Sequence, residues 1–201
     1  MRFPLPSPPM SPDRIVVAVL AGGASTRMGR DKGAAPIEGR PMLDWVVSAA
    51  EVVGDPVVIG RTDITSGVAA IPDLRDGSLG PLAGLEAALE YAAGREVALI
   101  AVDQPFVQPA TLDHLLSLPG DAVVPHADDR HQVTCAIYRA ACLEPTREAL
   151  DRGARSLLEL LHRISATVVD AATWTGWGED GRSWFSVDHP NDIEAGRRRF
   201  G

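Results

Sequence analysis

The sequence predicts a single α/β domain with a doubly wound, mostly parallel sheet. Three observations point to this class. The 201 residues match the length of one domain, about 100–200 residues. Short, continuous runs of β-branched residues are typical of parallel strands that are buried on both faces. Segments with apolar residues at helical spacing alternate with these runs, as in successive βαβ units.

The first βαβ unit is predicted within residues 15–60. Residues 15–20 (IVVAVL) form an apolar run that ends at two glycines, which indicates a buried strand followed by a loop. Residues 42–53 follow Pro41 and repeat apolar side chains at helical spacing, so they predict a helix. Residues 56–60 (PVVIG) predict the second strand.

The middle of the chain continues the alternation. Residues 69–73 predict a third strand, and residues 81–93 predict a helix because Pro81 suits its first turn. Residues 97–102 (VALIAV) predict another buried strand, which ends at Asp103. A helix over residues 109–118 and a strand over residues 122–125 follow.

The last third is predicted to complete the sheet and cover it. Apolar and polar side chains alternate over part of residues 132–139, which predicts a strand. Val168 and Val169 predict an edge strand. Three helices are expected, over residues 140–151, 156–164 and 190–199. Residues 171–183 are expected to form a loop. Residues 1–13 are rich in proline and are expected to be a disordered leader, which leaves residues 14–201 as the domain.

Composition excludes several classes of function. The net charge of −8 argues against a broad nucleic-acid or anionic-membrane surface. No apolar run approaches the length of about 18 residues that a membrane span requires. Cys135 and Cys142 fit neither a metal motif nor a disulfide framework, so we expect reduced thiols in a cytoplasmic protein.

The loop after the first strand has the composition of a polyphosphate cradle. It reads LAGGASTRMGRDK over residues 20–32, and its glycines allow backbone N–H groups to approach an anion. It matches neither a Walker A loop nor GxGxxG. Lys32 is the only lysine beside eighteen arginines, and its compact charge suits a site between phosphates. The alternative is a solvated surface lysine.

Asp103 is the first residue after a fully apolar predicted strand, within the sequence AVDQPF. Since ligands bind beyond the carboxyl ends of strands in such sheets, this carboxylate is placed to hold Mg²⁺. The alternative is a helix N-cap. A second glycine-containing segment, residues 73–84 (DLRDGSLGPLAG), allows close approach of a ligand or forms a plain turn and helix start.

These residues together resemble the molybdenum cofactor guanylyltransferase family, within the nucleotidyltransferases that carry an LAGG or LAAG loop. Four segments carry the resemblance, in the family's order and spacing: LAGGASTRMGRDK, DLRDGSLGPLAGL, AVDQPF and WFSVDHPNDI. The segment HQVTCAIYR is also similar to the family's sequence after the metal-binding strand. The resemblance covers residues 15–199 and implies a Rossmann-like nucleotidyltransferase fold.

The resemblance also implies an activity, a Mg²⁺ cofactor and site residues. The reaction would join GMP from GTP to the terminal phosphate of molybdopterin and release pyrophosphate. Catalysis would rest on Arg27, Lys32 and Asp103, with Asp103 as the Mg²⁺ ligand. The implied nucleotide-binding residues are Leu20, Ala21, Gly22, Gly23, Lys32, Gly60, Asp73, Gly80 and Asp103. The resemblance also implies that Arg130 and His131 face the pterin. It further implies transient contact with proteins that deliver the cofactor or receive it.

Two departures from the family phrases affect the metal site and the choice of base. Asp188 stands where the family has asparagine, and we interpret it as a second Mg²⁺ ligand, as in cytidylyltransferase relatives. Gly60 stands where the family has a base-contacting asparagine. Gly22 and Gly23, in place of Ala-Gly, favour guanine.

Three alternatives stay open. The first is a molybdopterin cytidylyltransferase. The second is another small-molecule nucleotidyltransferase, such as a sugar-1-phosphate enzyme, for which 201 residues leave little room. The third is a nucleotide-binding regulatory domain without turnover, which need not keep Arg27, Lys32 and Asp103 together.

Overall fold

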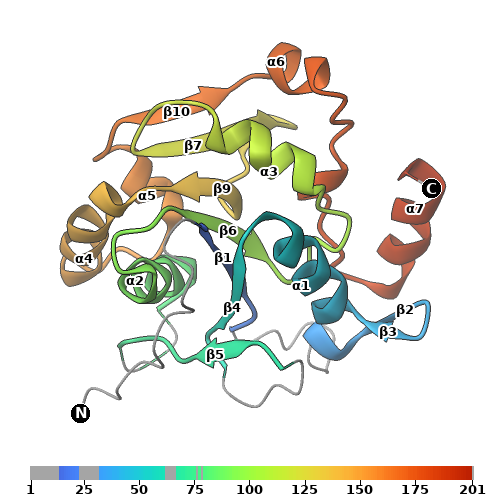
Figure 1. Cartoon of the computed structure of the whole chain (residues 1–201), viewed down its shortest axis with the longest axis horizontal. Coiled ribbons are helices and arrows are strands. Elements are labelled where there is room, and N and C mark those ends of the chain that lie inside the picture. Colours follow the sequence, from blue (N-terminus) through green and yellow to red (C-terminus); the bar gives the residue numbers. More distant parts are fainter. Residues whose placement is uncertain (1–13, 23–31, 62–66, 76, 78, 201) are drawn as a thin grey trace.

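A computed structural model describes residues 14–22, 32–61, 67–75, 77 and 79–200 (Figure 1). It confirms the doubly wound, mostly parallel α/β sheet in one domain. Within the described residues the main sheet has eight strands, in the order β10-β7-β9-β6-β1-β4-β5, with β8 paired to β7. These strands are β1 (Val16–Leu20), β4 (Asp55–Ile59), β5 (Ala69–Ile71), β6 (Val97–Ala101), β7 (Ala122–Ala127), β8 (Arg130–His131), β9 (Cys135–Tyr138) and β10 (Ala166–Val169).

The centre of the sheet is parallel. β1 pairs in parallel with β4 and β6, so Ala18 lies opposite Val57 on one side and Leu99 on the other. β9 is the exception, because it runs antiparallel between β6 and β7. β10 pairs with β7 alone and forms the predicted edge.

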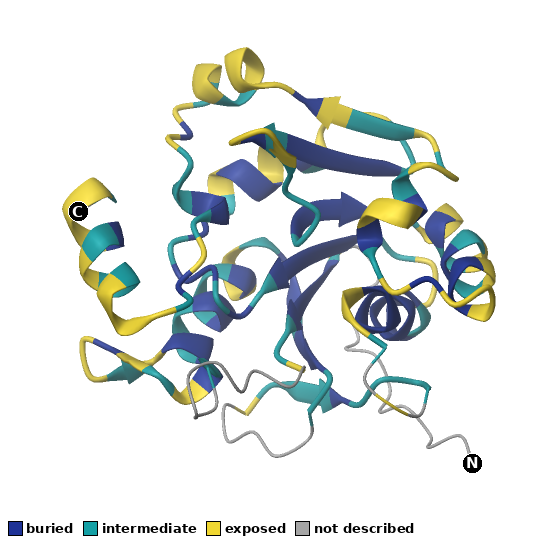
Figure 2. Cartoon of the chain, turned by 180° about the vertical axis from the view of Figure 1, so that it is seen from behind, coloured by how far each residue is buried: buried dark blue, intermediate teal, exposed yellow. Residues whose placement is uncertain are grey.

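Helices cover both faces of the sheet. On one face lie α2 (Pro81–Ala92), α4 (Leu143–Asp151) and α5 (Leu157–Leu161), and on the other lie α1 (Met42–Val53) and α3 (Pro109–Leu116). Alternate residues of β1 pack on opposite faces of the sheet. Val16 and Ala18 pack on the face covered by α2, and Val17 and Val19 pack on the face covered by α1. In both layers the buried residues lie toward the strands, and the outer faces of the helices include exposed residues (Figure 2).

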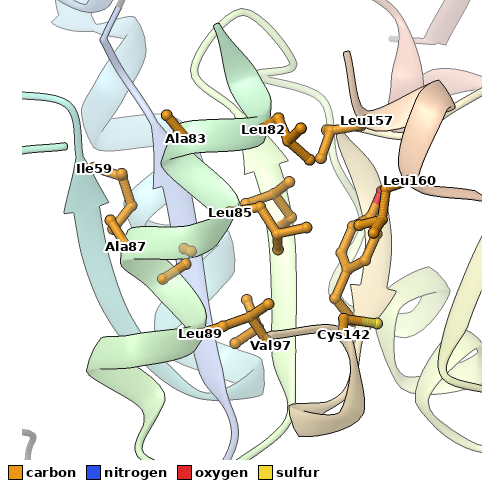
Figure 3. Close-up of a cluster of buried hydrophobic side chains, with 14 of the residues drawn as sticks. Ile59, Leu82, Ala83, Leu85, Ala87, Leu89, Val97, Cys142, Leu157 and Leu160 are labelled. Carbon is orange, nitrogen blue, oxygen red and sulfur yellow. The ribbon is translucent and has the colours of Figure 1, made fainter. Parts of the chain in front are cut away.

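The α2 layer shows how tightly the sheet is covered. In the close-up of Figure 3, Leu82, Leu85 and Leu89 project from one side of α2 toward the strands and the α4–α5 region. All three side chains are at most 2% exposed. Burial of one such leucine contributes about 1.5–3 kcal/mol relative to exposure, so this helix face holds the sheet firmly.

Several local predictions differ from the structure. Residues 171–183 are not all loop, because α6 (Ala171–Gly176) begins there with the Asp170 carboxylate accepting from Thr173 N. Of the strand predicted over 132–139, only β9 (Cys135–Tyr138) is a strand, because residues 132–134 form a turn after β8 in which Cys135 N donates to Gln132 O. The helix expected over 156–164 ends at Leu161.

Additional short elements join the predicted ones. A hairpin of β2 (Pro36–Ile37) and β3 (Arg40–Pro41) precedes α1, and the last helix, α7 (Pro190–Phe200), lies beside it (Figure 1). Among the described residues, no helix combines the length and the apolar character needed to cross a bilayer. The leader expected at 1–13 lies outside the described residues.

Candidate active site at the carboxyl end of the sheet

The carboxyl ends of β1, β4 and β6 meet at one edge of the sheet, and backbone hydrogen bonds continue beyond the strands there. Ala21 N donates to Ile59 O at 3.0 Å, and Val102 N donates to Leu20 O at 3.0 Å. The segments that leave these three strands are therefore held side by side. This is the edge at which ligands bind in open α/β sheets.

Lys32, Asp103 and Asp188 converge at this edge from three distant parts of the chain. The Lys32 ammonium lies 3.0 Å from Asp103 Oδ2 and 2.6 Å from Asp188 Oδ1. Lys32 opens a short 3₁₀ helix, η2 (Lys32–Ala34). Val187 N donates to Asp103 O at 2.7 Å, and this bond fixes the C-terminal segment beside the end of β6. We call Lys32, Asp103 and Asp188 the charged triad.

The triad is half-buried and electrostatically coupled. The Lys32 side chain is 14% exposed, that of Asp103 22% and that of Asp188 50%. Partial burial lowers the pKa of Lys32, but hydrogen bonds to Asp188 and Asp103 outweigh this and raise its pKa overall. The hydrogen bond from Lys32 lowers the pKa of Asp188, against the effect of its partial burial. Lys32 is therefore a fixed cation and Asp188 a fixed anion at neutral pH.

The two carboxylates fit the donor set of Mg²⁺. Both direct an oxygen at one cation, the Lys32 ammonium, so they already converge on a point of positive charge. Mg²⁺ prefers hard oxygen ligands and is usually held by one or two carboxylates plus substrate phosphates. Among the described residues, no group of three or more His, Cys, Asp or Glu side chains could hold a metal ion.

Gly22 and Gly60 lie against each other at the ends of β1 and β4. A Cβ on Gly22 would stand 2.8 Å from Gly60 Cα, and a Cβ on Gly60 would stand 2.6 Å from Gly22 Cα. Gly60 also has a φ of 89°, which side chains rarely adopt. The close backbone crossing therefore accounts for both glycines, and a nucleotide contact at either one stays a prediction.

Asp73 follows β5, on a segment held in place by an ion-pair network around the buried Glu86. Arg75 donates to both Glu86 oxygens, at 2.8 and 2.9 Å, and to Asp151 Oδ1 at 2.6 Å. Arg147 joins the network at 3.9 Å from Glu86. Burial and the nearby Glu86 charge raise the pKa of Asp73. The network ties the Asp73 segment to α2 and α4.

The other predicted residues are placed as follows. Gly80 precedes α2 with a φ of 75°, and a Cβ there would stand 2.9 Å from Arg155 O, so packing alone requires the glycine. Arg130 and His131 form β8 beyond the carboxyl end of β7, and His131 stacks edge-on against His126 at 5.1 Å. The predicted roles of Gly23 and Arg27 lie outside the described residues.

Sequence reasoning missed a buried acid that fastens the C-terminal segment. Glu179 is 3% exposed and accepts from Thr111 Oγ1 at 2.6 Å, from Gly181 N at 2.7 Å and from both the hydroxyl and the amide of Ser183. Ser183 Oγ in turn accepts from Gln108 N at 3.0 Å. We call Glu179, Thr111 and Ser183 the Glu179 clasp. Its only signal in sequence is an acid in a loop, which does not predict burial.

Comparison with known proteins gives consistent results. The family model for the MobA-like NTP transferase domain matches residues 17–167. A probable molybdenum cofactor guanylyltransferase of Deinococcus radiodurans is 34% identical over 188 residues, which cover 89% of this chain and 92% of that protein. A molybdenum cofactor guanylyltransferase of Yersinia pestis is 32% identical over 160 residues, covering 76% of this chain and 82% of the relative.

Solved structures share the fold. The molybdopterin-guanine dinucleotide biosynthesis protein A of Archaeoglobus fulgidus superposes with a TM-score of 0.79 at 25% identity, over 92% of this chain and 97% of that chain. The 2-C-methyl-D-erythritol 4-phosphate cytidylyltransferase of Thermus thermophilus gives a TM-score of 0.70 at 18% identity, over 92% and 98%. The second likeness concerns the fold alone.

Proposed function

Because the chain belongs to the MobA-like NTP transferase family, we propose that it transfers GMP from GTP to the terminal phosphate of molybdopterin and releases pyrophosphate. The observation that carries the proposal is the charged triad at the carboxyl end of the sheet. Relatives that are named guanylyltransferases and that match most of this chain favour GTP as the donor.

The reaction needs positioning and charge neutralisation more than covalent chemistry from the protein. An oxygen of the molybdopterin phosphate attacks the α-phosphorus of GTP, and the bond from that phosphorus to the β-phosphate oxygen breaks. The acceptor oxygen is already anionic, so no general base has to remove a proton. Negative charge then grows on the leaving pyrophosphate, and fixed cations stabilise it.

The residues of the triad divide this work. Lys32, whose pKa is raised, stays protonated and offers a compact charge to the phosphates. Asp103 and Asp188 would provide oxygen ligands for a Mg²⁺ ion. When bound, Mg²⁺ neutralises phosphate charge and polarises the reacting phosphoryl group.

A pyrophosphate assay tests the proposal directly. The pure protein is incubated with Mg²⁺ and molybdopterin and with GTP or CTP, and pyrophosphate release is measured. We expect release with GTP that depends on molybdopterin. Release with CTP in preference to GTP would replace guanylyl by cytidylyl transfer, and no release with either nucleotide would overturn the proposed activity.

Two substitutions connect the activity to the triad. Asp103→Ala should reduce turnover at least about tenfold, since loss of such electrostatic stabilisation typically costs a hundredfold or more. Asp188→Asn should raise the Mg²⁺ concentration for half-maximal rate and leave the nucleotide preference unchanged, because a carboxylate binds Mg²⁺ better than an amide does. Asp113→Asn, an exposed change on α3, is the matched control. An unchanged Mg²⁺ requirement in Asp188→Asn would exclude Asp188 as a metal ligand.

A further inference from the structure

A crevice of about 810 Å³ lies between α1, the β2–β3 hairpin, the segment after β6 and α7. Figure 1 shows these four parts gathered on one side of the molecule. The volume falls within the range of about 300–1,000 Å³ that is typical of small-molecule sites. The crevice is lined by none of the triad residues, so it is a separate feature.

The lining combines flat aromatic surfaces with guanidinium groups. Trp45, Phe106 and Phe200 come from α1, the segment after β6 and α7. The Arg40 guanidinium lies over the Trp45 ring at 5.2 Å, and that of Arg182 lies over the Phe200 ring at 5.4 Å. Such a lining suits a flat ring, which can stack on the aromatic faces and on the guanidinium planes.

The charged groups of the crevice favour a ligand with negative charge. Three arginines line it, Arg40, Arg182 and Arg197, against one carboxylate, Glu38, and Arg182 is paired with Asp180 from outside the lining. Arg197 is paired with Glu38 across the gap between the hairpin and α7. Arg40 donates through one nitrogen, Nη2, to Asp44 O at 2.6 Å and to Ser48 Oγ, and in the part of the chain that is described no carboxylate pairs with it.

The walls of the crevice continue directly from the charged triad. The hairpin begins at Pro36, four residues after Lys32, and the lining segment begins at Pro105, two residues after Asp103. α7 begins two residues after Asp188. A small apolar cluster that includes Ile37 and Val187 joins the hairpin to the C-terminal segment. A molecule in the crevice would therefore contact all three segments that hold the triad.

We propose that this crevice binds a flat ring compound that carries a negative charge. A pterin and a purine with an acidic substituent share this chemistry. The ring stacks among Trp45, Phe106 and Phe200, and the acidic group accepts hydrogen bonds from those Arg40 N–H groups that bond to nothing else within the described residues. This binding does not require nucleotidyl transfer, so the proposal stands or fails independently of the proposed activity.

The test uses two probes, pterin-6-carboxylate and GMP, and two measurements, calorimetric titration and tryptophan fluorescence. We expect saturable binding of at least one probe by both methods. Trp45→Phe should remove most of the fluorescence change while calorimetry still detects binding. Arg40→Gln should weaken binding about tenfold or more, because hydrogen bonds to a charged group commonly contribute that much.

A matched control separates binding in the crevice from binding elsewhere on the protein. Arg152→Gln removes an exposed arginine that is paired with Glu148 on α4, and it should bind the probes as the parent does. The two probes distinguish a pterin from a purine ligand. Binding of GMP that Arg40→Gln does not weaken would place GMP elsewhere. The proposal is overturned if neither probe binds, or if Arg40→Gln binds both as tightly as Arg152→Gln does.

Discussion

At the scale of single residues, Lys32 has the most demanding geometry, because one ammonium group serves two carboxylates from distant segments. An arginine would keep the charge, but its planar guanidinium group would form a bidentate pair with only one of the two carboxylates. Lys32→Arg should therefore reduce turnover about tenfold or more while changing GTP affinity less. Steady-state rates and nucleotide titrations measure both quantities. Equal turnover in Lys32→Arg would show that the position requires charge alone.

Asp73 provides a prediction about pH. Its pKa is raised by burial and by Glu86, so its charge destabilises the folded state at neutral pH. This cost disappears as the pH falls below the ordinary pKa of aspartate, where the carboxyl group is protonated in both folded and unfolded chains. Asp73→Asn should therefore unfold at a higher temperature at pH 7 and at nearly the parent temperature at about pH 3.

The same variant tests whether Asp73 is kept for binding. If Asp73 contacts the nucleotide, Asp73→Asn should bind GTP more weakly even though it is more stable at pH 7. Melting curves at the two pH values and a GTP titration give both readouts. A lower melting temperature at pH 7 would contradict the electrostatic argument.

How much of the site could be predicted depends on where each signal lies. Lys32 is conspicuous as the only lysine, and Asp103 as the first charge after an apolar strand, so sequence alone singles them out. Asp188 was predicted beside Asp103, and the structure joins the two through Lys32. The partnership of Arg75 with Glu86 has no sequence signal, because its members meet only after α2 packs on the sheet.

At the scale of secondary structure, the predictions succeed where burial shapes the sequence. The β1 and β6 runs are apolar because both faces of these strands are covered, and they were predicted to within one residue. α6 was missed because it has no buried residue and therefore no periodicity. The β2–β3 hairpin was missed because two-residue strands are too short to show alternation.

The Glu179 clasp is the connection between elements that we expect to matter most for stability. Glu179→Gln leaves a buried amide among groups that donate hydrogen bonds, and this should lower stability by about 2 kcal/mol. For a chain of this length the melting temperature should fall by about 4–8 °C. Asp180→Asn, the exposed neighbour that pairs with Arg182, is the matched control and should melt nearly as the parent does. Equal melting of both variants would contradict the importance of the clasp.

At the scale of the whole molecule, the N-terminal segment provides a prediction from composition. Residues 1–11 hold four prolines and no apolar periodicity, so they have little surface to bury. Deleting residues 1–11 should change neither the melting temperature nor the rate of pyrophosphate release. Thermal unfolding and the activity assay on the shortened chain check this. A drop of several degrees would show that the segment packs on the domain.

The antiparallel strand β9 has a consequence for the order in which the molecule assembles. β1, β4, β5 and β6 can pair with one another once residue 101 has been made, because each has its neighbour in that set. β7 has no place beside them until β9 lies between β7 and β6. During synthesis, which proceeds from the N-terminus, the two halves of the sheet therefore stay unconnected until residue 138 leaves the ribosome. Until then the edge of β6 is open, and Val97–Ala101 is exposed to pairing with the strand of another chain.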